Sequence, residues 1–166
     1  MRREGVKIFK AKSAEEALSS LMRQCARAEK SSGDALRLMA RWGVEQERRA
    51  EVLERLIAEK FIDDRRYAEA YVREKLNLSG WGARKISSAL KAKGIAQSII
   101  TESLSDLDRG SMSERLYAKI ERKARTVKYK DQYDRKSKLI GYGMSLGYDY
   151  DMVLDAVSQI ITIEDE

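Results

Sequence analysis

Two adjacent carboxylates, Asp63 and Asp64, come closest to a catalytic pattern in this sequence. Neighbouring aspartates can bind Mg²⁺ and so support a metal-dependent nuclease. They can also begin a helix, because a carboxylate accepts hydrogen bonds from first-turn amides and favours the positive end of the helix dipole. The chain has no histidine, the commonest general base and a frequent metal ligand. We therefore expect the two aspartates to cap a helix, and we expect no enzymatic activity and no metal or other cofactor.

The other short patterns point away from nucleotide chemistry and secretion. The glycines between Gly141 and Gly147 have the wrong spacing for a dinucleotide-binding loop and follow no predicted strand, so we assign them to helix packing and capping. The single cysteine, Cys25, lies in an amphipathic stretch and is expected to be a small buried hydrophobe. One thiol excludes an internal disulfide, and no segment resembles a signal peptide or a membrane span. We expect a cytoplasmic protein without membrane contact, and we expect it to be a monomer.

With catalytic and nucleotide-binding patterns set aside, the remaining functional feature is positive charge, since 33 lysines and arginines outnumber 27 acidic residues. The excess is concentrated in two stretches, from Gly80 to Gly94 and from Arg109 to Lys138. The candidate contacts to a polyanion or an acidic protein groove are Arg84, Lys85, Lys91, Lys93, Arg115, Lys119, Arg122, Lys123, Arg125, Lys128 and Lys130. Spacings of three and four residues allow several of them to line one helix face, which can track phosphates or simply face solvent. Trp81, Tyr129 and Tyr133 lie among these charges and can either stack on bases or anchor the hairpins.

The elements that must position these residues repeat along the chain. The dipeptides Gly43-Val44, Gly94-Ile95 and Gly147-Tyr148 recur at intervals of about 50 residues, with similar sequence around each. Apolar residues spaced three and four apart on both sides of each glycine indicate a helix, a glycine-terminated turn and a second helix. The chain has no proline, and alanine, leucine, arginine, lysine and glutamate dominate, which favours helices. The predicted fold class is all-α.

We predict three tandem three-helix repeats, at residues 13–60, 61–108 and 109–166, after a basic leader at residues 1–12. Ser13 and Ser111 each precede a glutamate by three residues and are expected to start helices as capping boxes. Each repeat is too small to bury a core of its own, so neighbours are expected to share apolar surface in an elongated, curved array. The acidic residues from Glu164 to Glu166 are expected to form a frayed tail.

One segment resembles a known family. Its motif residues, at ordered spacing, are Phe61, Asp63, Asp64, Arg66, Tyr67, Gly80, Gly82, Ile86, Leu90 and Gly94. This pattern is similar to the core motif of the RecX family, bacterial regulators of the RecA recombinase, and the layout of three tandem three-helix units also looks like that family. The sequence departs from the usual pattern at Ala83, where proline is common, at Lys85, where arginine is usual, and at Ala89, where glutamate is common. The motif residues look mainly architectural, since they end one unit, cap a helix and set a turn.

The resemblance implies a non-enzymatic modulator that lodges in the helical groove of the RecA filament on single-stranded DNA. It implies inhibition of filament growth and of RecA's ATP hydrolysis, strand exchange and coprotease activity, with a role in DNA recombination, DNA repair and the SOS response. The candidate basic residues would then contact acidic RecA surface and the enclosed DNA. The alternative is a stand-alone basic helical protein that binds nucleic acid directly through its phosphates.

Overall fold

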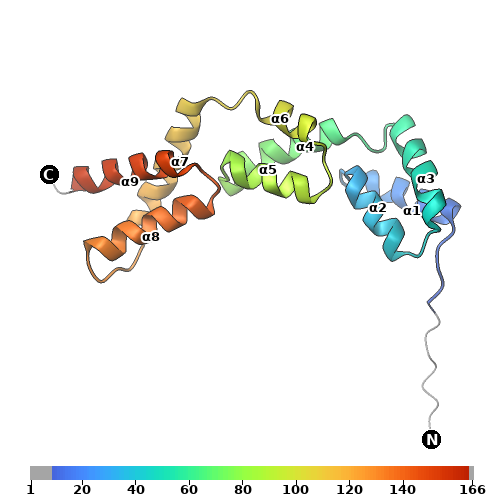
Figure 1. The fold of residues 1–166 in the computed structure, drawn as a ribbon, viewed down its shortest axis with the longest axis horizontal. Coiled ribbons are helices and arrows are strands. Elements are labelled where there is room, and N and C mark those ends of the chain that lie inside the picture. The colour runs from blue at the N-terminus through green and yellow to red at the C-terminus, as the bar shows by residue number, and fades with distance from the viewer. Residues whose placement is uncertain (1–8, 165–166) are drawn as a thin grey trace, which may run out of the picture. The chain divides into compact units, whose positions relative to one another are not determined.

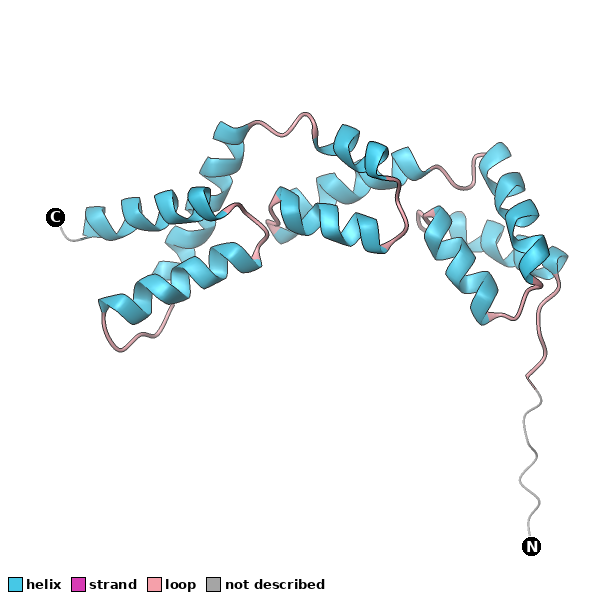
Figure 2. Ribbon diagram, in the orientation of Figure 1, coloured by secondary structure: helices cyan, strands magenta, loops and turns pink. Residues whose placement is uncertain are grey.

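The computed structural model describes residues 9–164, which form α-helices, one π-helical turn and connecting loops and contain no strand (Figure 2). The predicted all-α fold is therefore confirmed. Residues 1–8 of the predicted leader and residues 165–166 of the predicted acidic tail lie outside the described range. Glu164, expected in that tail, is instead the last residue of a helix. Within the described range, no helix is both long enough and apolar enough to cross a membrane.

This range divides into two compact units. The first unit holds the residues up to Tyr67 and the short segment Lys93–Ile95, and the second holds Ala68–Ala92 and the chain from Ala96 onward. Each unit has its own hydrophobic core. The division into three repeats, with boundaries at residues 61 and 109, stays a prediction.

Three helices form most of the first unit: α1 (Ala14–Cys25), α2 (Ser32–Arg41) and α3 (Gln46–Ala58) (Figure 1). The spacing of their apolar residues places Leu21, Met39 and Leu56 in a core where all three side chains are fully buried. Cys25 is half-buried against this core, and burial raises the pKa of its thiol. Cys25 therefore packs against the core as predicted, but it is half-buried rather than buried.

Helix α4 (Asp64–Glu74) begins in the first unit and continues into the second, where it passes directly into a π-helical turn, Lys75–Ser79, called the π-turn below. The remaining helices are α5 (Ala83–Ala92), α6 (Gln97–Leu104), α7 (Arg109–Ala124), α8 (Gln132–Ser145) and α9 (Tyr150–Glu164). Helices α7, α8 and α9 pack against one another (Figure 1), around the fully buried Leu116, Ile120 and Leu139. Most of the second unit's core therefore comes from these last three helices.

The three repeated glycines close helices as predicted. Gly43, Gly94 and Gly147 have φ angles of +72°, +80° and +90°, in the left-handed region where an added Cβ is strained. They follow α2, α5 and α8, respectively, and so end those helices. Gly80 has a φ of +67° and closes the π-turn in the same way.

One predicted helix start is confirmed and one is wrong. The Ser13 hydroxyl accepts a hydrogen bond from Glu16 N at 3.1 Å, and α1 begins directly after Ser13. Helix α7 begins at Arg109 rather than after Ser111. The reason is that the Asp108 carboxylate accepts a hydrogen bond from Ser111 N at 2.8 Å, which caps the helix earlier in the sequence.

Candidate functional site

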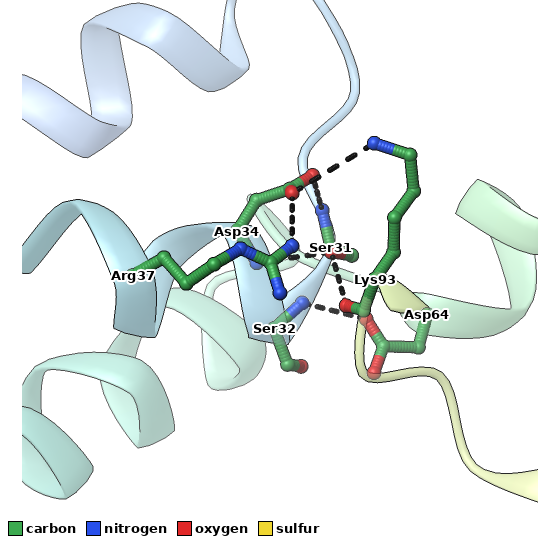
Figure 3. A network of polar contacts seen from close by, with 6 residues as sticks. All are labelled: Ser31, Ser32, Asp34, Arg37, Asp64 and Lys93. Atoms are coloured by element: carbon green, nitrogen blue, oxygen red, sulfur yellow. Dashed lines mark hydrogen bonds and ion pairs between the residues drawn. The ribbon is translucent and has the colours of Figure 1, made fainter. Parts of the chain in front are cut away.

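The two adjacent aspartates lie at the start of α4 and bind backbone amides. Asp63 Oδ1 accepts a hydrogen bond from Arg66 N at 3.1 Å, which caps α4 as predicted. Asp64 Oδ1 instead accepts from Ser32 N, at the start of α2, at 2.8 Å (Figure 3). The prediction that both aspartates cap one helix is therefore wrong for Asp64, because its carboxylate lies within reach of a different helix. The described residues include no group of three or more side chains of metal-binding type placed to hold an ion.

A polar network at the start of α2 includes one of the predicted contact residues, Lys93 (Figure 3). Ser31 Oγ donates to the Lys93 carbonyl at 3.1 Å, while the Asp34 carboxylate lies 2.7 Å from Arg37 Nη2 and 3.9 Å from Lys93 Nζ. Burial alone would raise the pKa of Asp34, but the Arg37 and Ser31 hydrogen bonds and the Lys93 charge outweigh it and lower this pKa. Lys93 is thus already engaged inside the first unit.

Arg66, from the motif, ties two connections of the first unit together. Its guanidinium binds both carboxylate oxygens of Glu29, at 2.7 Å and 3.2 Å, in the connection between α1 and α2. It also donates to the carbonyls of Lys60 and Phe61, between α3 and α4. The Glu29 hydrogen bond raises the pKa of Arg66. This forked arrangement, which only the planar guanidinium provides, gives Arg66 an architectural place in the fold.

The apolar residues and glycines of the motif are also placed where the fold needs them. Tyr67, Ile86 and Leu90 are buried, and Phe61 is half-buried against the first core. Gly82 lies at a close approach of two backbone segments, because a Cβ there would stand 2.5 Å from the Gly147 carbonyl oxygen. These positions account for the motif without assigning it a binding role.

Trp81, between Gly80 and Gly82, packs within the second unit. Lys85 Nζ lies 4.4 Å and Lys75 Nζ 5.0 Å from the centre of its ring, and the Tyr71 ring meets it edge-on with 6.5 Å between centroids. Lys85 Nζ also donates to the Ser145 carbonyl at 3.2 Å. Of the two roles open from the sequence, these contacts favour an anchor over a stacking platform for bases.

Arg115 and Lys119 of α7 reach the same turn. Arg115 Nη1 donates to Asn77 Oδ1 at 3.2 Å and to the Leu76 carbonyl at 3.4 Å. The Lys119 side chain crosses Gly80 so closely that a Cβ on this glycine would collide with it. The cations gathered at the π-turn are therefore Lys75, Lys85, Arg115 and Lys119, and Lys75 is not among the contacts predicted from the sequence.

The other predicted contacts face solvent or make local interactions. Those with exposed side chains and no interaction described above are Arg84, Lys91, Arg122, Lys128 and Lys130. Lys123 Nζ lies 5.3 Å from the centre of the Tyr142 ring, and Arg125 pairs with Glu121 at 2.9 Å. Only some of the predicted residues are thus brought together in one place.

Comparison with known proteins identifies the family. A family model described as "RecX, second three-helix domain" matches residues 63–104. Regulatory protein RecX of Clostridium botulinum (strain Alaska E43 / Type E3) is 30% identical over 155 residues, which cover 92% of this chain and 70% of the relative. The chain belongs to the RecX family.

Two further RecX proteins extend the comparison. Regulatory protein RecX of Mycobacterium sp. (strain KMS) is 32% identical over 113 residues, 66% of this chain and 62% of the relative. The crystal structure of RecX from Lactobacillus salivarius matches with a TM-score of 0.76 and 19% identity, over 90% of this chain and 97% of that chain, which supports the fold. The chain spans 70% or less of the length of the two curated relatives.

The RecX family model covers only part of the candidate surface. Its matched range, 63–104, includes the π-turn and the predicted contacts Arg84, Lys85, Lys91 and Lys93. Arg115 and Lys119 lie outside that range, although the structure brings both to the π-turn. Tertiary contacts therefore bring Arg115 and Lys119 to the π-turn, although the family model covers the π-turn and not these two residues.

A second basic region of this RecX-family chain is the connection between α7 and α8. Tyr129 is 46% exposed and lies beside Lys128 and Lys130, and Tyr133 at the start of α8 is 82% exposed. The buried Arg135, which is not among the contacts predicted from the sequence, has its guanidinium 5.2 Å from the centre of the Tyr129 ring. These two tyrosines leave aromatic surface open to solvent, unlike Trp81.

Proposed function

We propose that this RecX-family protein regulates the RecA recombinase by binding the RecA filament on single-stranded DNA, in the filament's helical groove. Binding there inhibits RecA's ATPase, strand exchange and coprotease activities. The observation that carries the proposal is 30% identity to a regulatory protein RecX over 92% of the chain. Regulation of this kind needs no bond-breaking residue, since occupying a groove blocks the movements of the protein that forms it.

The π-turn region supplies a surface suited to such a partner. Lys75, Lys85, Arg115 and Lys119 lie around one turn, and several are held by contacts within the chain. Cations held in fixed positions lose little side-chain entropy on binding, and they favour encounters with an acidic protein surface. We infer that this surface, together with the exposed Arg122, faces the recombinase.

Filament binding can be tested directly with a fluorescently labelled form of this protein. Its anisotropy is followed during titration with RecA filaments assembled on single-stranded DNA, and separately with the same DNA alone. The proposal expects binding to the filament at concentrations where the bare DNA leaves the anisotropy unchanged. Equal affinity for filament and bare DNA would contradict it.

A second candidate function is direct binding of nucleic acid, favoured by the exposed tyrosines between α7 and α8. Tyr129 lies between Lys128 and Lys130 in the sequence, and Tyr133, at 82% exposure, follows at the start of α8, so bases could stack while phosphates meet the lysines. Binding through phosphates weakens steeply as salt rises, because condensed counterions are released on binding. Strong binding of bare single-stranded DNA with a steep salt dependence, lost in Tyr133→Ala, would favour this candidate over filament regulation.

A further inference from the structure

The π-turn exposes an apolar side chain where the surrounding surface is charged. Leu78 is 79% exposed, the largest value for any leucine, isoleucine or methionine among the described residues. Leu76, two residues earlier on the same turn, packs against the core of the second unit. The π-turn therefore directs one leucine inward and the other to solvent.

The backbone on both sides of Leu78 is fixed. Ahead of it, Arg115 donates a hydrogen bond to the Leu76 backbone carbonyl and another to the side chain of Asn77. After it, the Gly80 and Trp81 amides both donate to the Lys75 carbonyl, the latter at 3.0 Å, which closes the turn. A side chain carried on a braced backbone loses little conformational entropy when it is buried by a partner. Single π-helical turns of this kind are rare and often occur at functional sites.

The rim of this exposed leucine is basic. Lys75 begins the turn, and Arg115 and Lys119 reach it from α7. The sequence from Lys75 to Thr101 contains no acidic residue, although Glu74 lies 3.3 Å from Lys75 Nζ and offsets part of its charge. A central apolar side chain with charged residues at the edge is the usual arrangement of an energetically important contact in a protein interface.

The chemistry of this surface fits a protein better than a nucleic acid. Leucine has no aromatic face on which a base could stack. The nearby Trp81 has two lysine ammonium groups over its ring and the Tyr71 ring against its edge, so its stacking surface is already used. A partner with an acidic surface around an apolar pocket would satisfy both the leucine and the cations.

We propose that Leu78 is the apolar anchor of a protein-docking surface, made of Leu78, Lys75, Arg115 and Lys119, which takes an acidic protein surface with an apolar pocket. The inference rests on the proposed function, in which the partner is the RecA filament, and adds the side chain on which binding depends. Partner binding would then depend on Leu78, a residue that charge patterns in the sequence do not indicate.

The test compares Leu78→Ala and Leu78→Met with Ile57→Ala, a control at a 47% exposed isoleucine on α3. Affinity for RecA filaments is measured by anisotropy at low and high salt, and circular dichroism checks each fold. Leu78→Ala is expected to weaken binding by roughly tenfold or more, as truncation of a central interface residue does, while Ile57→Ala stays within about twofold. Leu78→Met, which conserves volume and apolar character, should retain most of the affinity. The Leu78→Ala loss should persist at high salt, whereas the loss from Arg115→Ala should shrink.

The outcomes separate this inference from the function on which it rests. If the wild-type protein binds filaments and Leu78→Ala binds them equally tightly, the proposed Leu78 docking surface is wrong. The proposed regulation of the filament is then unaffected. If the wild-type protein does not bind filaments, both the Leu78 docking surface and the proposed function are wrong. An equal loss of affinity for bare DNA in Leu78→Ala, or a loss of self-association measured by sedimentation, would assign Leu78 to a nucleic acid or to a second copy of the chain and overturn the inference.

Discussion

The backbone amide of Gly82 donates a hydrogen bond to the carbonyl of Leu146, with 2.7 Å between nitrogen and oxygen. The start of α5 is thereby joined to the glycine-closed end of α8. The first unit contains a similar junction, in which Ser31 Oγ, at the start of α2, donates to the carbonyl of Lys93. A Cβ on Gly33 would collide with that Lys93 carbonyl, as one on Gly82 would with Gly147. The same helix-to-turn junction, with a glycine at the close approach, is thus used twice.

Gly82→Ala is expected to destabilise the protein by on the order of 1–3 kcal/mol, because the added Cβ must displace backbone rather than a flexible side chain. Gly141→Ala is the matched control, since that helical glycine has no neighbour within 4 Å of an added Cβ. The control should be neutral or stabilised by up to about 1 kcal/mol, as expected of alanine in a helix. Urea unfolding followed by circular dichroism measures both. Equal stability of the two variants would show that the Gly82 junction tolerates movement.

Asp64→Ala is expected to cost about 1–2 kcal/mol of stability, because Ser32 N loses its carboxylate partner at the start of α2. Asp155→Ala, at an exposed position of α9, should change stability by less than about 0.5 kcal/mol. Chemical denaturation of both variants tests this structural role. Metal-dependent DNA cleavage by the wild-type protein that disappears in folded Asp64→Ala would instead support a catalytic role for the carboxylate.

Acid should destabilise the first unit partly through Asp34. The folded carboxyl has a pKa below its ordinary value of 3.8, so it contributes stability above that pH and loses it as the pH falls through the lower folded value. Asp34→Asn should therefore be less stable than wild type near neutral pH and should lose less stability on acidification. Urea midpoints between about pH 6 and about pH 2 measure the two slopes. Identical slopes would mean that Asp34 has the same pKa in the folded and unfolded chains.

Arg122, Lys123 and Arg125 test the electrostatic part of the account. Replacing all three by glutamate is expected to raise the concentration needed for half-inhibition of RecA by at least about fivefold at low salt, since an acidic partner would then be repelled. The matched control reverses three exposed acids of the first unit, Glu45, Glu47 and Glu51, to lysine. Equal losses from both triple variants, with folding intact, would contradict a contact between the recombinase and this end of α7.

Much of the fold follows from local sequence signals. Gly43, Gly94 and Gly147 predict their turns because only glycine adopts the left-handed backbone without strain, and the structure has positive φ at all three. The Ser111 prediction fails because a capping box is a short pattern, and Asp108 nearby supplies a competing cap. The π-turn was not predicted either. Local amides close this turn, and Arg115, far along the sequence, also contacts it, so no periodic pattern in the sequence indicates it.

The candidate site was only partly predictable for the same reason. Charge density selected Arg115 and Lys119, but their meeting with Lys75 at the π-turn depends on the packing of α7. Lys93 was selected by the same criterion, and the structure instead engages it with Asp34. Leu78 carries no charge and belongs to no motif, so only its exposure in the structure distinguishes it from Leu76.

Whether this RecX-family protein acts by binding another protein can be decided by measuring RecA ATP hydrolysis on single-stranded DNA. The protein is titrated into the reaction while its occupancy of the bare DNA is followed separately. Hydrolysis is expected to fall with increasing protein at concentrations that leave the bare DNA unbound. Hydrolysis that continues unchanged in a saturating excess of the protein would contradict it.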